Sequence, residues 1–189
     1  MKRKLLLLTI LLFSAFTSSA QIFRLGLKAG INYANQNGTT INVNGTNYNA
    51  EAISSYHVGL ISQIKLSKGF SFQPELLYST QGATYKPVTV LQDINNKLGY
   101  IAIPVIAKIN LNNTFSLELG PQASFLLSKK NEVSLGDQNS FDFALVGGLG
   151  INITKNIFIQ GRYGLGLTEV STNAKSKNSV IQVSAGFMF

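Results

Sequence analysis

The stretch Phe115-Ser-Leu-Glu-Leu-Gly-Pro-Gln-Ala-Ser-Phe125 alternates at every step between an apolar residue and a polar or small one. A period of two predicts a β-strand whose two faces meet different surroundings. The pattern covers 11 residues, whereas strands in globular sheets average about 5–6 and tilted membrane-crossing strands need about 9–11. The stretch therefore predicts a long strand with one face suited to lipid.

The same pattern recurs along the chain, and no segment shows sustained helical periodicity. The predicted strands are residues 22–33, 55–67, 70–82, 97–110, 114–127, 141–153, 157–168 and 179–189. An even number of antiparallel strands closes into a barrel without an edge, as a bilayer requires. We therefore expect an all-β fold, an eight-stranded antiparallel up-and-down transmembrane β-barrel. Because proline removes a ladder hydrogen bond, we expect local bulges at Pro74, Pro104 and Pro121.

Three features favour an apolar face on the outside. The polar face carries few charges, and tight turns at 68–69, 111–113 and 154–156 alternate with longer loops at 34–54, 83–96, 128–140 and 169–178. Aromatic residues gather near the strand ends, as in the girdles of membrane barrels with short periplasmic turns and long external loops. One rim would hold Phe23, Phe70, Phe72, Phe115, Phe187 and Phe189, and the other Tyr33, Tyr56, Tyr78, Phe125, Phe141 and Phe143. Tyr163 falls in the middle of its predicted strand and belongs to neither rim. A soluble barrel with an apolar interior remains the alternative to a membrane barrel.

Composition narrows the function. The 189 residues include no cysteine and one histidine, which excludes disulfide scaffolds, thiolate zinc sites, cysteine nucleophiles and multi-histidine metal sites. Charged residues make up 13% of the chain, against about 25% in soluble domains. The basic residues are dispersed, which argues against nucleic-acid binding. We assign no catalytic, cofactor-binding or metal-binding residue and expect no cofactor.

The first 20 residues predict a secretory signal peptide. Lys2-Arg3-Lys4 precedes an apolar run over 5–16, and Ser18-Ser19-Ala20 provides small residues for cleavage before Gln21. The run is shorter than the roughly 20 residues that a membrane-spanning helix needs. We therefore divide the chain into a signal peptide, 1–20, and an outer membrane β-barrel domain, 21–189, exported to the outer membrane.

A series of motifs follows the predicted strands in order. They are Gly69-Phe-Ser-Phe-Gln-Pro-Glu-Leu-Leu-Tyr78, Tyr100-Ile-Ala-Ile-Pro-Val-Ile-Ala-Lys108, Leu119-Gly-Pro-Gln-Ala123, Phe141-Asp-Phe-Ala-Leu-Val-Gly-Gly-Leu-Gly150, Arg162-Tyr163 and the terminal phenylalanine. In this order they resemble the PorT-like outer membrane β-barrel family of Bacteroidetes. The resemblance implies an eight-stranded outer membrane barrel and, through the family's namesake, a link to type IX secretion, although most relatives have no assigned activity. The chain departs from many members at Ala102, where they carry an acidic residue.

Charged residues on the polar face are the candidate functional groups. They are Arg24, Lys28, Lys65, Lys108 and Arg162, with Glu75, Glu118 and Asp142. A charge in a narrow lumen must be paired, so we expect a structural network, with Arg162 and Lys108 as candidate partners of Glu118. A proton or ion path, or a binding site, is the alternative.

Two further features of the sequence give weaker indications of a functional site. His57 is the one imidazole, and we expect it inside the barrel near the external rim, with no motif that places a serine beside it. The stretch Gly161-Arg-Tyr-Gly-Leu-Gly166 is similar to a nucleotide-binding loop, but no helix follows it. We expect its glycines to relieve crowding.

We therefore expect a non-enzymatic barrel with a structural or interaction role in the envelope. Alternatives are a small-solute or ion channel, or an envelope lipid-modifying enzyme or protease. Expected partners are outer membrane lipid and lipopolysaccharide, met by Lys129, Lys130, Lys175 and Lys177, and an envelope or secretion protein. The last strand, ending at Phe189, resembles the signal that the barrel assembly machinery reads.

The predicted signal peptide implies a mature chain that begins at Gln21. Mass analysis of the N-terminus of protein extracted from membranes should find no peptide from residues 1–20. Recovery of the intact leader in the membrane fraction would contradict this prediction.

Overall fold

The computed structural model describes residues 22–37, 40–43, 46–87, 94–131, 139–168 and 177–189, so the predicted leader lies outside the described residues. The strands are β1 (Phe23–Asn37), β2 (Thr40–Val43), β3 (Thr46–Lys65), β4 (Phe70–Pro87), β5 (Ile94–Asn110), β6 (Phe115–Asn131), β7 (Phe141–Asn152), β8 (Ile157–Gly166) and β9 (Lys177–Met188). Within this part of the chain, no helix has the length and hydropathy needed to cross a membrane.

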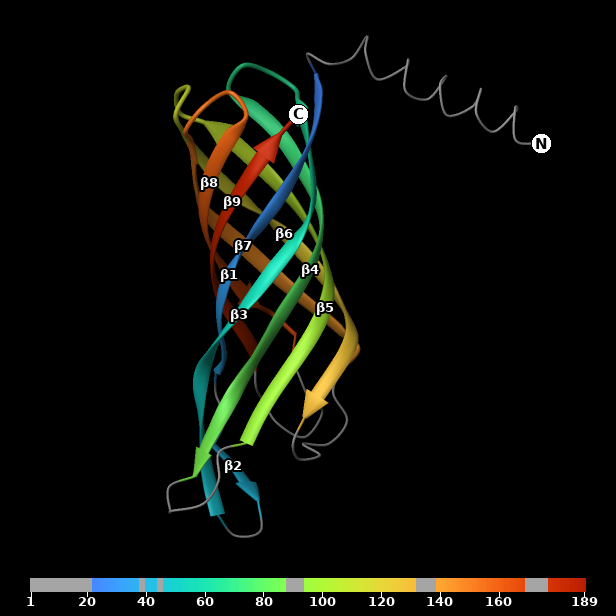
Figure 1. The fold of residues 1–189 in the computed structure, drawn as a ribbon, viewed down its shortest axis with the longest axis vertical. Coiled ribbons are helices and arrows are strands. Elements are labelled where there is room, and N and C mark those ends of the chain that lie inside the picture. Colours follow the sequence, from blue (N-terminus) through green and yellow to red (C-terminus); the bar gives the residue numbers. More distant parts are fainter. Residues whose placement is uncertain (1–21, 38–39, 44–45, 88–93, 132–138, 169–176) are drawn as a thin grey trace, which may run out of the picture.

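Eight strands form a closed antiparallel barrel. The order of hydrogen-bonded neighbours is β1-β9-β8-β7-β6-β5-β4-β3, and β3 pairs with β1 to close the ring (Figure 1). The short β2 is a ninth strand that extends β3 as a hairpin, with Val43 opposite Thr46. The prediction of an eight-stranded up-and-down barrel is therefore confirmed, with β2 as an addition outside the ring.

The two ends of the barrel differ in length. The short-turn end carries the turns 66–69, 111–114 and 153–156, each tied by main-chain hydrogen bonds such as Leu111 N to Phe115 O at 3.0 Å. At the opposite long-loop end, β3 to β6 run further than expected, and pairing reaches Tyr48 with Pro87 and Asn96 with Asn131. The polar residues there suggested loops. They form strand because they pair with neighbouring strands, and strand propensity depends on such context.

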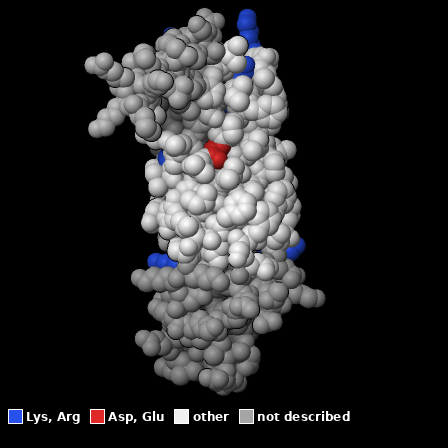
Figure 2. All heavy atoms as spheres, turned by 90° about the vertical axis from the view of Figure 1, so that its right-hand side faces the viewer, with Lys and Arg blue, Asp and Glu red and all other residues white. Residues whose placement is uncertain are grey.

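Side chains alternate between the lumen and the outside. In β6, Leu119 is 57% exposed whereas Glu118 beside it is 3% exposed, and β8 and β9 show the same alternation. The face drawn in Figure 2 is mostly uncharged, apart from one small acidic patch, and its Lys and Arg residues lie mainly toward the two ends. A soluble barrel would bury the apolar face, so that alternative is wrong.

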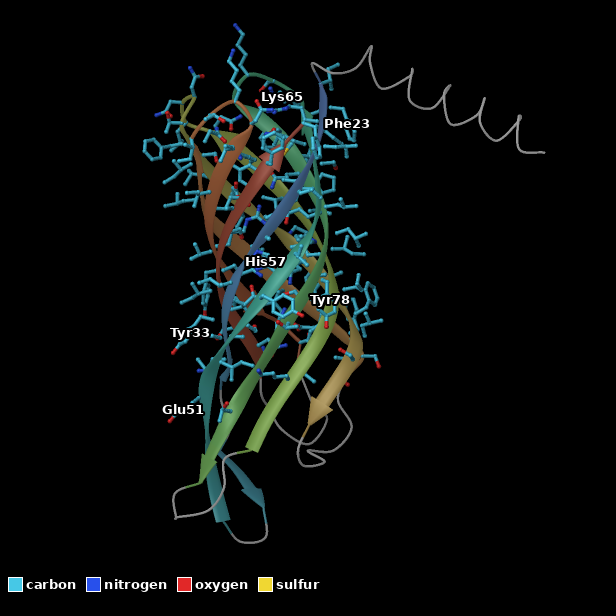
Figure 3. All side chains as sticks on the ribbon, viewed as in Figure 1. Phe23, Tyr33, Glu51, His57, Lys65 and Tyr78 are labelled. Carbon is cyan, nitrogen blue, oxygen red and sulfur yellow. The ribbon has the colours of Figure 1, made fainter. Side chains whose placement is uncertain are left out.

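The aromatic residues form two separate rims. The neighbouring rings are Phe70 with Phe72 at 5.2 Å and Phe187 with Phe189 at 5.6 Å at the short-turn end, and Tyr56 with Tyr78 at 6.2 Å and Phe125 with Phe141 at 5.4 Å at the other. Figure 3 shows Phe23 beside the short-turn end, and Tyr33 and Tyr78 toward the long loops. Tyr163, predicted mid-strand, is exposed between the rims.

The expected proline bulges are wrong. The β4–β5 register is the same at Pro74 with Val105 and at Leu77 with Ala102, although the ladder is interrupted between those pairs. The β5–β6 register is likewise unchanged from Pro104 with Gln122 onward, and Pro121 pairs with Leu145 in a continuous ladder. An N–H in a strand faces one neighbour only, so a proline removes one bond without shifting the pairs around it. The register shifts lie elsewhere, between Ala52 and His57 and between Gly99 and Tyr100.

Candidate functional site

The centre of the lumen is crossed by an ion-pair network built on Arg162 of β8. Its Nη1 and Nη2 donate to the two carboxylate oxygens of Glu75 on β4, at 3.0 and 2.8 Å. Its Nε donates to Glu118 Oε2 on β6 at 2.7 Å. All three residues are buried. One guanidinium therefore joins two carboxylates from separate strands, in the forked geometry that suits Arg better than Lys.

Four more side chains complete this network. Lys28 Nζ on β1 lies 2.6 Å from Glu75 Oε2, and Gln73 Nε2 donates to Glu75 Oε1 at 2.7 Å. On the other side, Gln160 Nε2 donates to Glu118 Oε1 at 2.7 Å, and Lys108 Nζ on β5 lies 3.5 Å from the same oxygen. The strands β1, β4, β5, β6 and β8 thus all contribute to one layer across the lumen, which we call the charge layer (Lys28, Gln73, Glu75, Lys108, Glu118, Gln160 and Arg162).

The network agrees with the predicted pairing and refines it. Both candidate partners of Glu118 contact it, and Glu75 and Lys28 belong to the same layer. Three of the predicted interior charges lie elsewhere, because their strand positions are near the barrel ends. They are Arg24, which bonds the main-chain oxygens of Met188 and Phe189, Lys65, which is exposed at the rim, and Asp142, which accepts hydrogen bonds from Thr168 and Asn178.

Glycines on β7 make room for the charge layer. A Cβ at Gly148 would lie 2.7 Å from Arg162 Cγ, and one at Gly150 would lie 2.7 Å from Glu118 Oε1. In the glycine-rich stretch of β8, crowding was expected, and it holds for Gly166, whose Cβ would lie 2.5 Å from Asn178 O. For Gly161 the expectation is wrong, because this residue faces outward and nothing lies within 4 Å of its Cβ position.

His57 lies in a second polar layer, nearer the long-loop end, and has a partner that the sequence did not reveal. Asn32 Nδ2 donates to the main-chain oxygen of Thr80 at 2.8 Å, which leaves Asn32 Oδ1 as the acceptor facing His57 Nδ1 at 2.7 Å. His57 Nδ1 therefore carries the proton, and Nε2 accepts from Ser184 Oγ at 2.8 Å. Period-two alternation could place His57, Asn32 and Ser184 on the inner face, but the register between distant strands was needed to join them.

The Ser184–His57–Asn32 chain has the order of groups of a catalytic triad. All three residues are 1–2% exposed. Neither Ser184 nor His57 lines either of two small cavities that border the lumen in the described part of the chain. Among the described residues, the serine oxygen is therefore buried and lines neither of these cavities.

The two cavities lie on opposite sides of the charge layer. One, of about 20 Å³, is at the short-turn end and is lined by Lys108, Phe158 and Met188 among others. The other, of about 10 Å³, is at the long-loop end beside Gln81 and Asp142. A water molecule needs roughly 10–15 Å³, so each cavity holds about one. Neither is lined by Glu75, Glu118 or Arg162, which separate them.

The lysines expected to meet lipopolysaccharide are only partly visible. Lys175 and the side chains of Lys129 and Lys130 lie outside what the structure describes. Lys177 is exposed where β9 begins, at the long-loop end.

An edgeless barrel with an apolar outside, two aromatic rims and a polar lumen defines an integral β-barrel membrane protein. A family model described as outer membrane protein beta-barrel domain matches residues 18–172. The chain therefore belongs to this family and is an outer membrane protein, whose short-turn end we take as periplasmic.

Comparisons with known proteins agree on the fold. Among solved structures, Ail, the attachment invasion locus protein of Yersinia pestis, is similar with a TM-score of 0.53 and 11% identity, over 88% of this chain and 98% of that one. OprG from Pseudomonas aeruginosa is similar with a TM-score of 0.51 and 10% identity, over 89% and 94%. None of the curated proteins matches the chain in sequence. At these identities the likeness is one of fold alone.

The charge layer predicts a large loss of stability for Glu118→Ala. The variant leaves the buried Arg162 and Lys108 without one carboxylate, at a cost on the order of 3–5 kcal/mol. Urea unfolding of the barrel in detergent measures this loss. Lys65→Ala, which truncates an exposed rim charge, is the control and should change the free energy of unfolding by less than about 0.5 kcal/mol. Equal unfolding midpoints for Glu118→Ala and wild type would contradict the pairing.

Proposed function

We propose that this protein is a non-conducting, non-enzymatic barrel with a structural or interaction role in the cell envelope. The observation that carries the proposal is the charge layer, which fills the cross-section of the lumen. A barrel closed in this way acts through the surfaces that it presents at its two ends, because the charge layer stands between them.

Lumen size argues against the channel alternative. Eight strands enclose a space just wide enough for side chains, and here the two cavities of about 20 and 10 Å³ do not join through the charge layer. An ion crossing the lumen would have to displace Arg162 from both carboxylates, which breaks buried charge-assisted hydrogen bonds.

Burial argues against the enzyme alternative. A nucleophile must lie about 3 Å from both its base and a site where the reacting atom can sit. Ser184 meets the first condition through His57, at 2.8 Å, but it is 2% exposed and lines neither of the two cavities described above. The hydrogen-bonded chain from Ser184 to Asn32 is best understood as satisfied polar packing.

The long-loop end supports an interaction role. Strands β3, β4, β5 and β6 continue past the point where β7 and β8 part, since the β7–β8 ladder ends at Ala144 with Gly166. The barrel wall therefore extends further on the side of β3 to β6 than on the side of β7 and β8. This extension includes the β2–β3 hairpin at the lower end of Figure 1. We take this external sheet as the surface for an envelope partner.

The remaining parts of the proposal come from the sequence. Lipopolysaccharide phosphates would meet the external lysines, including the exposed Lys177. The motifs shared with PorT-like proteins support a secretion protein as the envelope partner. Cleavage before Gln21 would export the chain, and the last strand would present Phe189 to the assembly machinery. Phe189 is 67% exposed, and its N–H donates to Leu25 O at 2.8 Å, next to the seam between β1 and β9.

Planar-bilayer recordings test this proposal. Wild-type protein should show no discrete single-channel conductance. The double variant Glu75→Ala Arg162→Ala removes one carboxylate and its guanidinium together, opens the middle of the charge layer and should give measurable steps. Heat-dependent gel migration checks that both proteins are folded, because closed barrels resist unfolding. Stable conductance in the folded wild type would contradict the proposal and favour the channel.

A further inference from the structure

The charge layer contains one more cation than carboxylates. Among the described residues it brings together Lys28, Lys108 and Arg162 with Glu75 and Glu118, all buried. A buried charge without a counterpart is costly. With all five groups ionised, the layer therefore carries one more positive than negative charge.

The excess positive charge falls on Lys108. Arg162 makes three hydrogen bonds of 2.7–3.0 Å to the two carboxylates, and Lys28 lies 2.6 Å from Glu75. Lys108 Nζ reaches Glu118 only at 3.5 Å, beyond the 2.7–2.9 Å usual for a charge-assisted bond. Its other contact is the Phe158 ring, 5.6 Å to the centroid. An ammonium group has three protons to donate, so Lys108 has donors that these contacts do not use.

Asp142, the further buried carboxylate among the described residues, is too far away to compensate. Glu118 pairs with Gly148 on β7, six positions along the strand from Asp142. At a rise of about 3.3 Å per residue this separation is about 20 Å. Asp142 also has its own donors, Thr168 at 2.7 Å and Asn178 at 3.1 Å.

Lys108 lines the cavity at the short-turn end, which opens toward the periplasm. Arg24 of β1 and Lys155 of the β7–β8 turn line it as well, together with the amide side chains of Gln73, Asn152 and Asn156. None of the residues that line it is acidic. Arg24 already donates to the main-chain oxygens of Met188 and Phe189, at 3.4 Å each, which uses two of its five N–H donors.

We propose that this periplasmic pocket binds a phosphate-type oxyanion through Lys108. The cavity of about 20 Å³ admits one oxygen, which would take the unused donors of Lys108 and supply the missing negative charge. The rest of the phosphate would lie at the mouth near Lys155 and the amide donors, with any ester group outside. Inorganic phosphate and the phosphodiester of a phospholipid headgroup share this chemistry. The site is independent of the proposed interaction role, because it lies at the opposite end of the barrel.

Phosphorus-31 NMR on the purified barrel in an uncharged detergent tests the site. Sodium phosphate is added at constant ionic strength against sodium chloride. Saturable broadening or shift of the phosphate resonance is expected for wild type, with at least tenfold weaker binding for Lys108→Gln. The control is Lys65→Gln, an exposed lysine at the same end that does not line the pocket, and it should bind as wild type does.

Stability provides a second readout that does not depend on resonance changes. Phosphate should raise the unfolding temperature of wild type and of Lys65→Gln relative to chloride, since a ligand that binds only the folded state stabilises it. Lys108→Gln removes the uncompensated charge, so it should fold and show no response to phosphate. An equal response in Lys108→Gln and wild type would overturn the proposal.

A lipid arm distinguishes the two sources of phosphate. Short-chain phosphatidylglycerol, monitored in the same way, should bind in a Lys108-dependent manner if the headgroup is the ligand. Lys108-dependent binding of that lipid without binding of inorganic phosphate supports the site and identifies a lipid source. Failure of both to bind wild-type protein, or binding of both that Lys108→Gln leaves unchanged, refutes the site.

Discussion

The sharing of the Arg162 guanidinium between Glu75 and Glu118 is the interaction on which the lumen depends. The bilayer requires a closed sheet, and eight strands leave a lumen that side chains fill. Replacing a buried ion network by apolar residues often leaves stability unchanged or higher, so stability alone does not explain these charges. They also fix the register: a slip of β8 by one residue would turn Arg162 from the lumen toward lipid.

The ion pairs of Arg162 with Glu75 and Glu118 also determine which residues surround them. Gly148 and Gly150 are small because Arg162 and Glu118 occupy the volume in front of them. Gln73 and Gln160 each donate a further hydrogen bond to one of the two carboxylates. Each carboxylate thus accepts a glutamine hydrogen bond in addition to its ion pairs, while Lys108, 3.5 Å from Glu118 at the periplasmic edge, has the longest ion pair in the layer.

Much of the fold can be predicted from the sequence, because alternation with a period of two indicates on which face of the sheet each residue lies. This pattern predicted eight strands, the polar lumen and the aromatic rims, and it made Arg162 and Lys108 candidate partners of Glu118 without choosing between them. The strand extensions were missed because Asn and Thr residues in β3 and β5 read as loop until a neighbour pairs with them. The contact between Ser184 and His57 joins residues far apart in the chain, and only the barrel's register brings them together. Gly161 was misjudged because its glycine neighbours suggested crowding that exists only on the inner face.

A double-mutant cycle on Glu75→Ala and Arg162→Met tests the central claim most directly. Free energies of unfolding in detergent would be measured for wild type, both single variants and the double variant. Direct contact inside the lumen predicts non-additivity of about 1–3 kcal/mol, the single variants each leaving a partner uncompensated. The cycle of Glu75→Ala with Lys65→Ala, at the exposed rim, should be additive within about 0.5 kcal/mol. Additivity for Glu75 and Arg162 as well would mean that the two groups do not interact, and would contradict a lumen closed by their ion pair.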